Sequence, residues 1–190
     1  MRGFDDEGVV LKKKTFNTIG EYFNWIYSNM AMAHVALKNG HEKYETIDFM
    51  IRAKLYKGLN TGTNHIASIY DDEKYKLSNV KCAYCGETNS LTIDHLISRS
   101  KGGVDSGENL VYACSHCNSS KYNRDLLEWC MDKGAFPPIL ILRRYLKLAY
   151  LHFEENRYFE LPFEQWEKCC NIFRLDLLPY EFPAPEFLKL

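Results

Sequence analysis

The stretch that decides the fold of this chain covers residues 81–124 and reads KCAYCGETNSLTIDHLISRSKGGVDSGENLVYACSHCNSSKYNR. It holds two Cys-x-x-Cys pairs, Cys82 with Cys85 and Cys114 with Cys117, which enclose 28 residues. Random placement of the chain's seven cysteines would give only about 0.25 such pairs. Four thiolates suit tetrahedral zinc and leave no open position on the metal. We therefore expect a structural zinc ion that stabilises the fold and takes no part in catalysis.

The histidine and the other cysteines near this pattern are assigned no metal. His116 lies inside the second pair and could replace a thiolate, although a spectator position is the simpler interpretation. Cys130, Cys169 and Cys170 have no metal-ligand spacing, and adjacent cysteines do not easily chelate one ion together. We expect these three to be ordinary buried thiols.

The residues between the two pairs predict a small α+β unit. A β-rich run over 91–97 is followed by a polar loop over 98–108 and a second short strand over 109–113. After the second pair the chain leads towards helix. The expected order is strand, loop, strand and helix, with zinc holding the two ends together. We call residues 81–124 the finger.

An Asp-His pair interrupts the first predicted strand of the finger. A neutral imidazole such as that of His95 can take a proton from water near neutral pH. A carboxylate such as that of Asp94 can bind a hard cation such as magnesium. A base and a Lewis acid together are what phosphodiester hydrolysis needs. Neighbours in a regular strand face opposite sides, so the two side chains either approach one phosphate from two sides or mark the end of the strand.

The finger as a whole resembles the HNH endonuclease family, whose core is the ββα-metal fold. The resemblance covers less than a quarter of the chain and rests on a set of spaced motifs: Cys82-x-x-Cys85, Asp94-His95, Gly102-Gly103, Asn109-Leu110 and Cys114-x-x-Cys117-Asn118-x-x-Lys121. The chain is thus expected to be an α+β protein, mainly helical around a zinc-stabilised HNH finger.

The resemblance implies a role for each motif residue. His95 would be the general base, and Asp94 would bind a catalytic magnesium or manganese ion. Asn109 would brace the loop and orient His95. Asn118 stands where many members have histidine, so this sequence resembles an HNN variant. Its amide oxygen can bind the same cation but is an uncharged and weaker ligand.

Charge supports a nucleic-acid substrate near the finger, although the whole chain has a net charge of −1. Residues 74–124 hold seven basic and four acidic side chains, so positive charge is concentrated there. The resemblance implies that Lys121 contacts a phosphate. We expect Arg99, Lys101 and Arg124 to contribute further contacts to DNA.

The remaining chain is expected to be helical on both sides, with regions at 1–80 and 125–190. Thr18 and Glu21 fit a capping box that opens a long helix ending near Gly40. A second helix is expected from about residue 46 to 57, before Gly58. Pro138 can open a further helix to about residue 156. The acidic N-terminus lacks a secretory signal and no apolar run approaches the ~20 residues of a membrane span, which favours a cytoplasmic protein.

Two other functions compete with metal-dependent cleavage of DNA. A non-catalytic zinc module that binds nucleic acid would explain the cysteines and the local charge, but not the Asp-His pair with its two asparagines. A protein-interaction domain is the third reading, and the helical regions would suit a protein partner or a homodimer. Small HNH proteins of bacteria and phages, including restriction and anti-phage defence nucleases, are similar by fold-level analogy.

Overall fold

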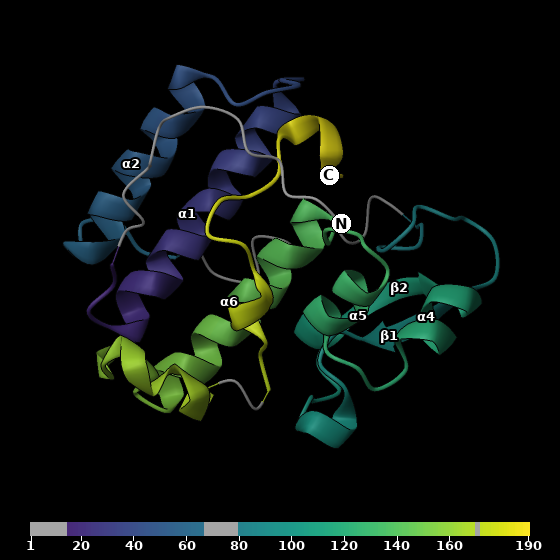
Figure 1. Cartoon of the computed structure of the whole chain (residues 1–190). Helices are drawn as coiled ribbons and strands as arrows, with labels where there is room; N and C mark the ends of the chain where they lie inside the picture. Colours follow the sequence, from purple (N-terminus) through teal and green to yellow (C-terminus); the bar gives the residue numbers. More distant parts are fainter. Residues whose placement is uncertain (1–14, 67–79, 170–171) are drawn as a thin grey trace, which may run out of the picture.

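The computed structural model describes residues 15–66, 80–169 and 172–190. Within these ranges five α-helices and a two-stranded sheet follow one another along the chain, with short 3-10 helices between and after them: α1 (Ile19–Lys38), α2 (Thr46–Asn60), β1 (Leu91–His95), β2 (Leu110–Cys114), α4 (Ser115–Lys121), α5 (Leu126–Asp132) and α6 (Ile139–Glu155). The expected α+β class is confirmed, with a small sheet inside a mainly helical chain (Figure 1).

The helical layer is built around α1, which lies between α2 and α6 (Figure 1). Thr18 caps this helix as expected, since its hydroxyl accepts a hydrogen bond from the backbone N–H of Glu21 at 3.1 Å. The apolar stripe of α1 is buried, including Phe23 and Ile26. Within the described parts of the chain, no helix combines the length and the apolar character needed to cross a lipid bilayer.

The finger consists of a β-hairpin followed by a short helix. Strands β1 and β2 are antiparallel, with Leu91 opposite Cys114 and His95 opposite Leu110. Helix α4 contacts both strands. The register brings the end of β1, where Asp94 and His95 lie, beside the start of β2 and the loop before it.

The finger and the helices share one hydrophobic core. Leu96 and Val111 of the finger belong to the same buried cluster as Phe23 of α1 and Leu142 of α6. Arg144 of α6 also donates hydrogen bonds to the backbone carbonyls of residues 107 and 108, at 2.6 Å for the first. Helix α6 therefore anchors the loop that precedes β2.

The predicted end of the second helix was wrong. Helix α2 does not end before Gly58 but continues to Asn60. Gly58 is buried, and a Cβ at this position would lie 2.4 Å from the side-chain nitrogen of Asn64. The glycine thus lets the Asn64 side chain approach the helix and does not end it.

Helix α4 begins inside the second cysteine pair, at Ser115. The Cys114 sulfur caps this helix by accepting a hydrogen bond from the backbone N–H of Cys117.

Candidate zinc centre and active site

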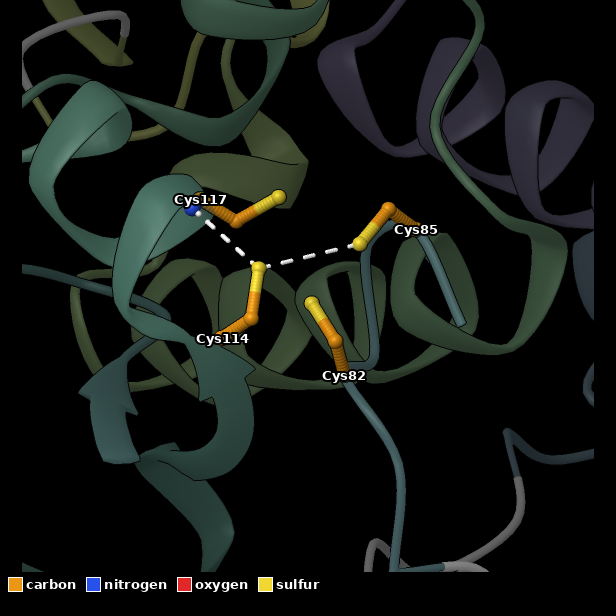
Figure 2. Close-up of side chains that lie close together, drawn as sticks. All are labelled: Cys82, Cys85, Cys114 and Cys117. Carbon is orange, nitrogen blue, oxygen red and sulfur yellow. Dashed lines mark hydrogen bonds between the residues drawn. The ribbon is translucent and has the colours of Figure 1, made fainter. Parts of the chain in front are cut away.

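The four predicted zinc ligands converge at the base of the hairpin. Cys82 and Cys85 lie in the turn before β1, Cys114 ends β2, and Cys117 lies in the first turn of α4 (Figure 2). Their sulfur atoms all lie within 4.8 Å of one another, and those of Cys85 and Cys114 are 3.7 Å apart. Four sulfurs at the usual ~2.3 Å from zinc would be ~3.8 Å apart at the corners of a tetrahedron. The cluster therefore fits a zinc ion.

Backbone hydrogen bonds shape the first cysteine pair into a tight turn. The N–H of Gly86 donates to the carbonyl of Cys82 at 2.9 Å, and the N–H of Cys82 donates to the carbonyl of Glu87 at 2.7 Å. Gly86 has a φ of +85°, a conformation that glycine adopts without steric cost. The turn presents both sulfurs to the same side.

The surroundings of Cys82 and Cys117 shift the pKa values of these two thiols in opposite directions. Burial raises the pKa of Cys82, but hydrogen bonds from Cys114, Cys85 and Tyr84 outweigh burial and lower the pKa to about 7. Burial and hydrogen bonds to Cys114 and Cys85 raise the pKa of Cys117 instead. Zinc binding would displace the remaining protons, since the thiolate is the form that binds metal.

The other candidates near the zinc centre do not join it. His116 is exposed and lies outside the cluster of metal-ligand type, as expected for a spectator. Cys130 and Cys169 are buried and lie outside it too. Cys170 lies outside the described residues. So do Lys74 and Lys76, two of the seven basic residues counted over 74–124.

The Asp94 side chain points into the protein. It is 5% exposed, and its Oδ2 accepts a hydrogen bond from the Tyr84 hydroxyl at 2.6 Å and pairs with the Lys121 ammonium at 3.2 Å. Burial and the Asp94 charge raise the pKa of Tyr84 well above its ordinary value, so this hydroxyl remains a donor. Asp94 Oδ1 accepts no hydrogen bond from a described residue and still touches solvent. One carboxylate oxygen is therefore left for a further ligand.

The position of Lys121 contradicts the expected contact between this residue and a DNA phosphate. The residue is 0% exposed, and besides Asp94 its ammonium donates to the backbone carbonyl of His95 at 2.8 Å. A lysine buried in this way has no free charge to offer to a polyanion. Its role here is to hold the end of β1 and the Asp94 carboxylate in place.

The His95 side chain points to the opposite side of the strand, towards solvent. Its Nε2 contacts Oδ1 of Asp105, and Nδ1 makes no hydrogen bond to a described residue. Arg99 donates to the same Oδ1, from Nε at 2.9 Å and from Nη2 at 2.7 Å, and its Nε also lies 3.3 Å from His95 Nε2. The hydrogen bonds from His95 and Arg99 lower the pKa of Asp105. An ionised Asp105 favours the tautomer with the proton on Nε2 and the lone pair on Nδ1.

Asn109 braces the loop that follows β1. Its side-chain nitrogen donates to the carbonyls of Ile97 at 2.8 Å and Val104 at 3.0 Å, and its oxygen accepts from the N–H of Ile97 at 2.8 Å. Gly103 makes this bracing possible, since a Cβ there would lie 1.8 Å from the Ile97 carbonyl oxygen and 2.8 Å from the Asn109 side-chain nitrogen. Gly102, with a φ of +88°, supplies the preceding left-handed residue.

Asn118 of helix α4 lies beside β1, against Thr92 on the strand face that also carries Asp94. Its side-chain nitrogen donates to the Thr92 hydroxyl at 2.9 Å and to the Ile93 carbonyl at 3.4 Å. These bonds orient the amide, and its oxygen accepts none from a described residue. An amide oxygen next to the strand that carries Asp94 is thus available as a ligand.

The three other predicted DNA contacts all take part in ion pairs within the chain. Arg99 pairs with Asp105, Lys101 lies 3.7 Å from Glu128, and Arg124 pairs with Asp132 at 2.7 Å. All three pairs are partly or largely solvent-exposed. Such pairs are weak in water, so phosphates can compete for these cations.

Comparison with known proteins gives two sequence matches. Residues 82–124 match the family model described as HNH endonuclease. These residues belong to the HNH endonuclease family. CRISPR-associated endonuclease Cas9 of Corynebacterium diphtheriae is 33% identical over 70 residues, which are 35% of this chain and 6% of that protein. The chain therefore matches a small part of a much longer relative. No solved structure shows significant similarity to the chain.

Two residues beside the HNH motif were missed by sequence reasoning. Tyr84 carries no motif signal, but a buried tyrosine needs a partner for its hydroxyl, and its place between two zinc ligands brings it close to the end of β1. Asp105 was counted only as an acidic residue. Its contact with His95 depends on how the loop folds back across ten residues, which no spacing rule describes.

Proposed function

We propose that this chain is a metal-dependent HNH endonuclease that hydrolyses DNA phosphodiester bonds. The observation that carries the proposal is that three side chains at or beside the end of β1 each keep one atom available for a ligand or a proton. His95 offers a free ring nitrogen on the solvent side, held by Asp105, while Asp94 and Asn118 each keep one oxygen without a partner among the described residues.

His95 is the proposed general base. With Nε2 donating to Asp105, the lone pair on Nδ1 takes the proton of the attacking water. The Asp105 carboxylate stabilises the imidazolium that results and keeps the ring oriented, as the third member of a catalytic triad does. Asn109 supports this arrangement by bracing the loop that carries Asp105.

Asp94 Oδ1 and Asn118 Oδ1 are the proposed ligands of a magnesium or manganese ion. Both are hard oxygen donors of the kind these cations take, and one carboxylate with several waters is a common set for magnesium. The cation would supply Lewis-acid stabilisation of the charge on the phosphate. Lys121 and Tyr84 hold the carboxylate through its other oxygen, so that Oδ1 keeps its direction.

DNA binding is proposed to use the exposed cations around His95. Arg99 is best placed, since its side chain is 67% exposed and it lies on the loop that follows His95 and carries Asp105. Lys101 and Arg124 can contribute after leaving their acidic partners. Because each phosphate contact releases counterions, affinity should fall as salt rises.

The test compares His95→Ala with a matched control, His116→Ala. His116 is an exposed histidine of the same finger that takes no part in the proposed chemistry. Both proteins and the parent are incubated with supercoiled plasmid in the presence of magnesium or manganese, and binding is measured on the same preparations. His95→Ala should cut about 10²–10⁴ times more slowly, with DNA affinity little changed. His116→Ala should cut like the parent.

Brief chelation should stop cleavage by the parent, and added magnesium or manganese should restore it. Zinc should stay bound meanwhile, because four thiolates hold their ion more tightly than two oxygens hold magnesium. Cleavage by His95→Ala at the parent rate, or undiminished cutting after chelation, would contradict the mechanism.

A non-catalytic zinc module that binds nucleic acid is the second candidate. The burial of Asp94 against Lys121 favours it, since a carboxylate already paired with a cation is a weaker metal ligand. A parent protein that binds DNA but cuts under no divalent metal would establish this alternative. If cleavage is observed, a role in restriction or anti-phage defence in the bacterial cytoplasm is the proposed context, tested by plaque counts with and without His95→Ala.

A further inference from the structure

We propose that a recess beside Asn118 binds an unstacked nucleobase of the substrate, with Tyr122 as the stacking platform. The inference rests on the proposed function and names how the substrate is held next to the candidate site. Its chemical target is the heterocyclic ring of a nucleotide, not the phosphate.

The recess has a volume of about 460 Å³, which is within the usual range of small-ligand sites. Its lining comes from the loop after β1 and from the end of α4: Ser98, Ser100, Asn118, Ser119, Tyr122 and Asn123. It includes Asn118, so anything bound there lies directly beside the proposed cation ligand.

Tyr122 holds its ring in the open at a costly backbone position. The residue is 74% exposed and ends helix α4 with φ 52° and ψ −125°. Its N–H donates to the Asn118 carbonyl at 2.8 Å, which fixes the turn. Positive φ is unfavourable for a bulky residue, and among the described rings none stacks on this one. Packing therefore gives no reason for a tyrosine here, whereas a ligand that stacks on the ring does.

The polar groups of the recess suit a base better than a phosphate. None of the six lining residues carries a charge. The Ser98 and Ser100 hydroxyls bond each other at 2.9 Å, while the side chains of Ser119 and Asn123 have no hydrogen-bond partner among the described residues. Uncharged donors and acceptors beside an aromatic face are the elements that hold unstacked bases in single-strand-binding proteins.

The test measures binding of two single-stranded 20-mers of equal charge, oligothymidylate and a fully abasic deoxyribose-phosphate chain. The zinc-loaded full chain is used without magnesium or manganese, so that no cleavage intervenes. Tyr122→Gly removes the ring and relieves the backbone, while Tyr122→Phe keeps both the ring and the strain. Thermal unfolding of each protein is recorded in parallel.

The parent and Tyr122→Phe should bind oligothymidylate about 5- to 150-fold more tightly than the abasic chain, the range for one stacked base. Tyr122→Gly should lose this preference while its melting temperature stays equal or rises. A preference that survives in Tyr122→Gly, or a parent that does not discriminate between the two oligomers, overturns the inference. Because the assay needs no cleavage, a failed plasmid assay would remove the proposed nuclease activity without deciding this point.

Discussion

Lys121→Met should destabilise the protein more than any surface substitution on the finger. The Lys121 ammonium lies 3.2 Å from Asp94 Oδ2 and 2.8 Å from the His95 carbonyl, with side-chain exposures of 0% for Lys121 and 6% for Asp94. Methionine fills a similar volume but leaves the buried carboxylate with only the Tyr84 hydroxyl. Removing one partner of a buried ion pair costs about 3–5 kcal/mol, and we expect a loss of free energy of unfolding in that range.

The assay is urea denaturation of zinc-loaded protein, with zinc content measured for each variant. Lys81→Met is the matched control, because Lys81 is an exposed residue of the same finger, and it should stay within about 0.5 kcal/mol of the parent. The pair of Lys121→Met with Asp94→Asn should lose less than the sum of the two single losses, since the double variant no longer buries an unpaired charge. A stability of Lys121→Met within about 0.5 kcal/mol of the parent, or strict additivity, would refute this account of the buried pair.

Further predictions concern the proposed zinc site and Asp105, which contacts the proposed general base. Purified protein should contain one zinc ion per chain. Cys114→Ser should lose both zinc and stability, because metal binding contributes folding free energy to a small unit. Elemental analysis and thermal unfolding measure the two effects, and a Cys114→Ser protein that is zinc-free but stable would contradict the prediction. Asp105→Asn should lower kcat with KM nearly unchanged, since an amide no longer enforces the Nε2–H tautomer of His95. Steady-state cleavage kinetics measure the split, and a change in KM alone would assign Asp105 to substrate binding.

Local patterns were enough to predict the four-cysteine cluster and the start of α1. The two cysteine pairs specify their own turn geometry, and Thr18 with Glu21 marks the start of α1 through contacts three residues apart. Such features depend on neighbours in the sequence. The two cysteine pairs are joined by a single hairpin, so their convergence also follows from the predicted strand order.

Distant partners account for what the sequence could not predict. The burial of Lys121 depends on the hairpin and on α4 closing over Asp94, so its motif position alone did not distinguish a phosphate contact from a buried pair. Lys101 and Arg124 meet acidic residues of α5 that follow the finger in sequence. In the sequence, Gly58 resembles a residue that ends a helix. The glycine is instead needed because Asn64 packs closely against it, and this packing contact leaves no mark in the local sequence pattern.

The hydrogen bonds from Arg144 bear on how this HNH motif can be moved between proteins. They secure the backbone at residues 107 and 108, immediately before Asn109, from a helix that lies outside the family motif. Leu96 and Val111 likewise complete their packing against helices before and after the finger. A graft of residues 82–124 alone into another scaffold would carry the four cysteines and the motif residues. It would lack the Arg144 hydrogen bonds that hold the loop next to His95. We therefore expect a graft to keep this loop in place only if it also brings α6 or an equivalent arginine.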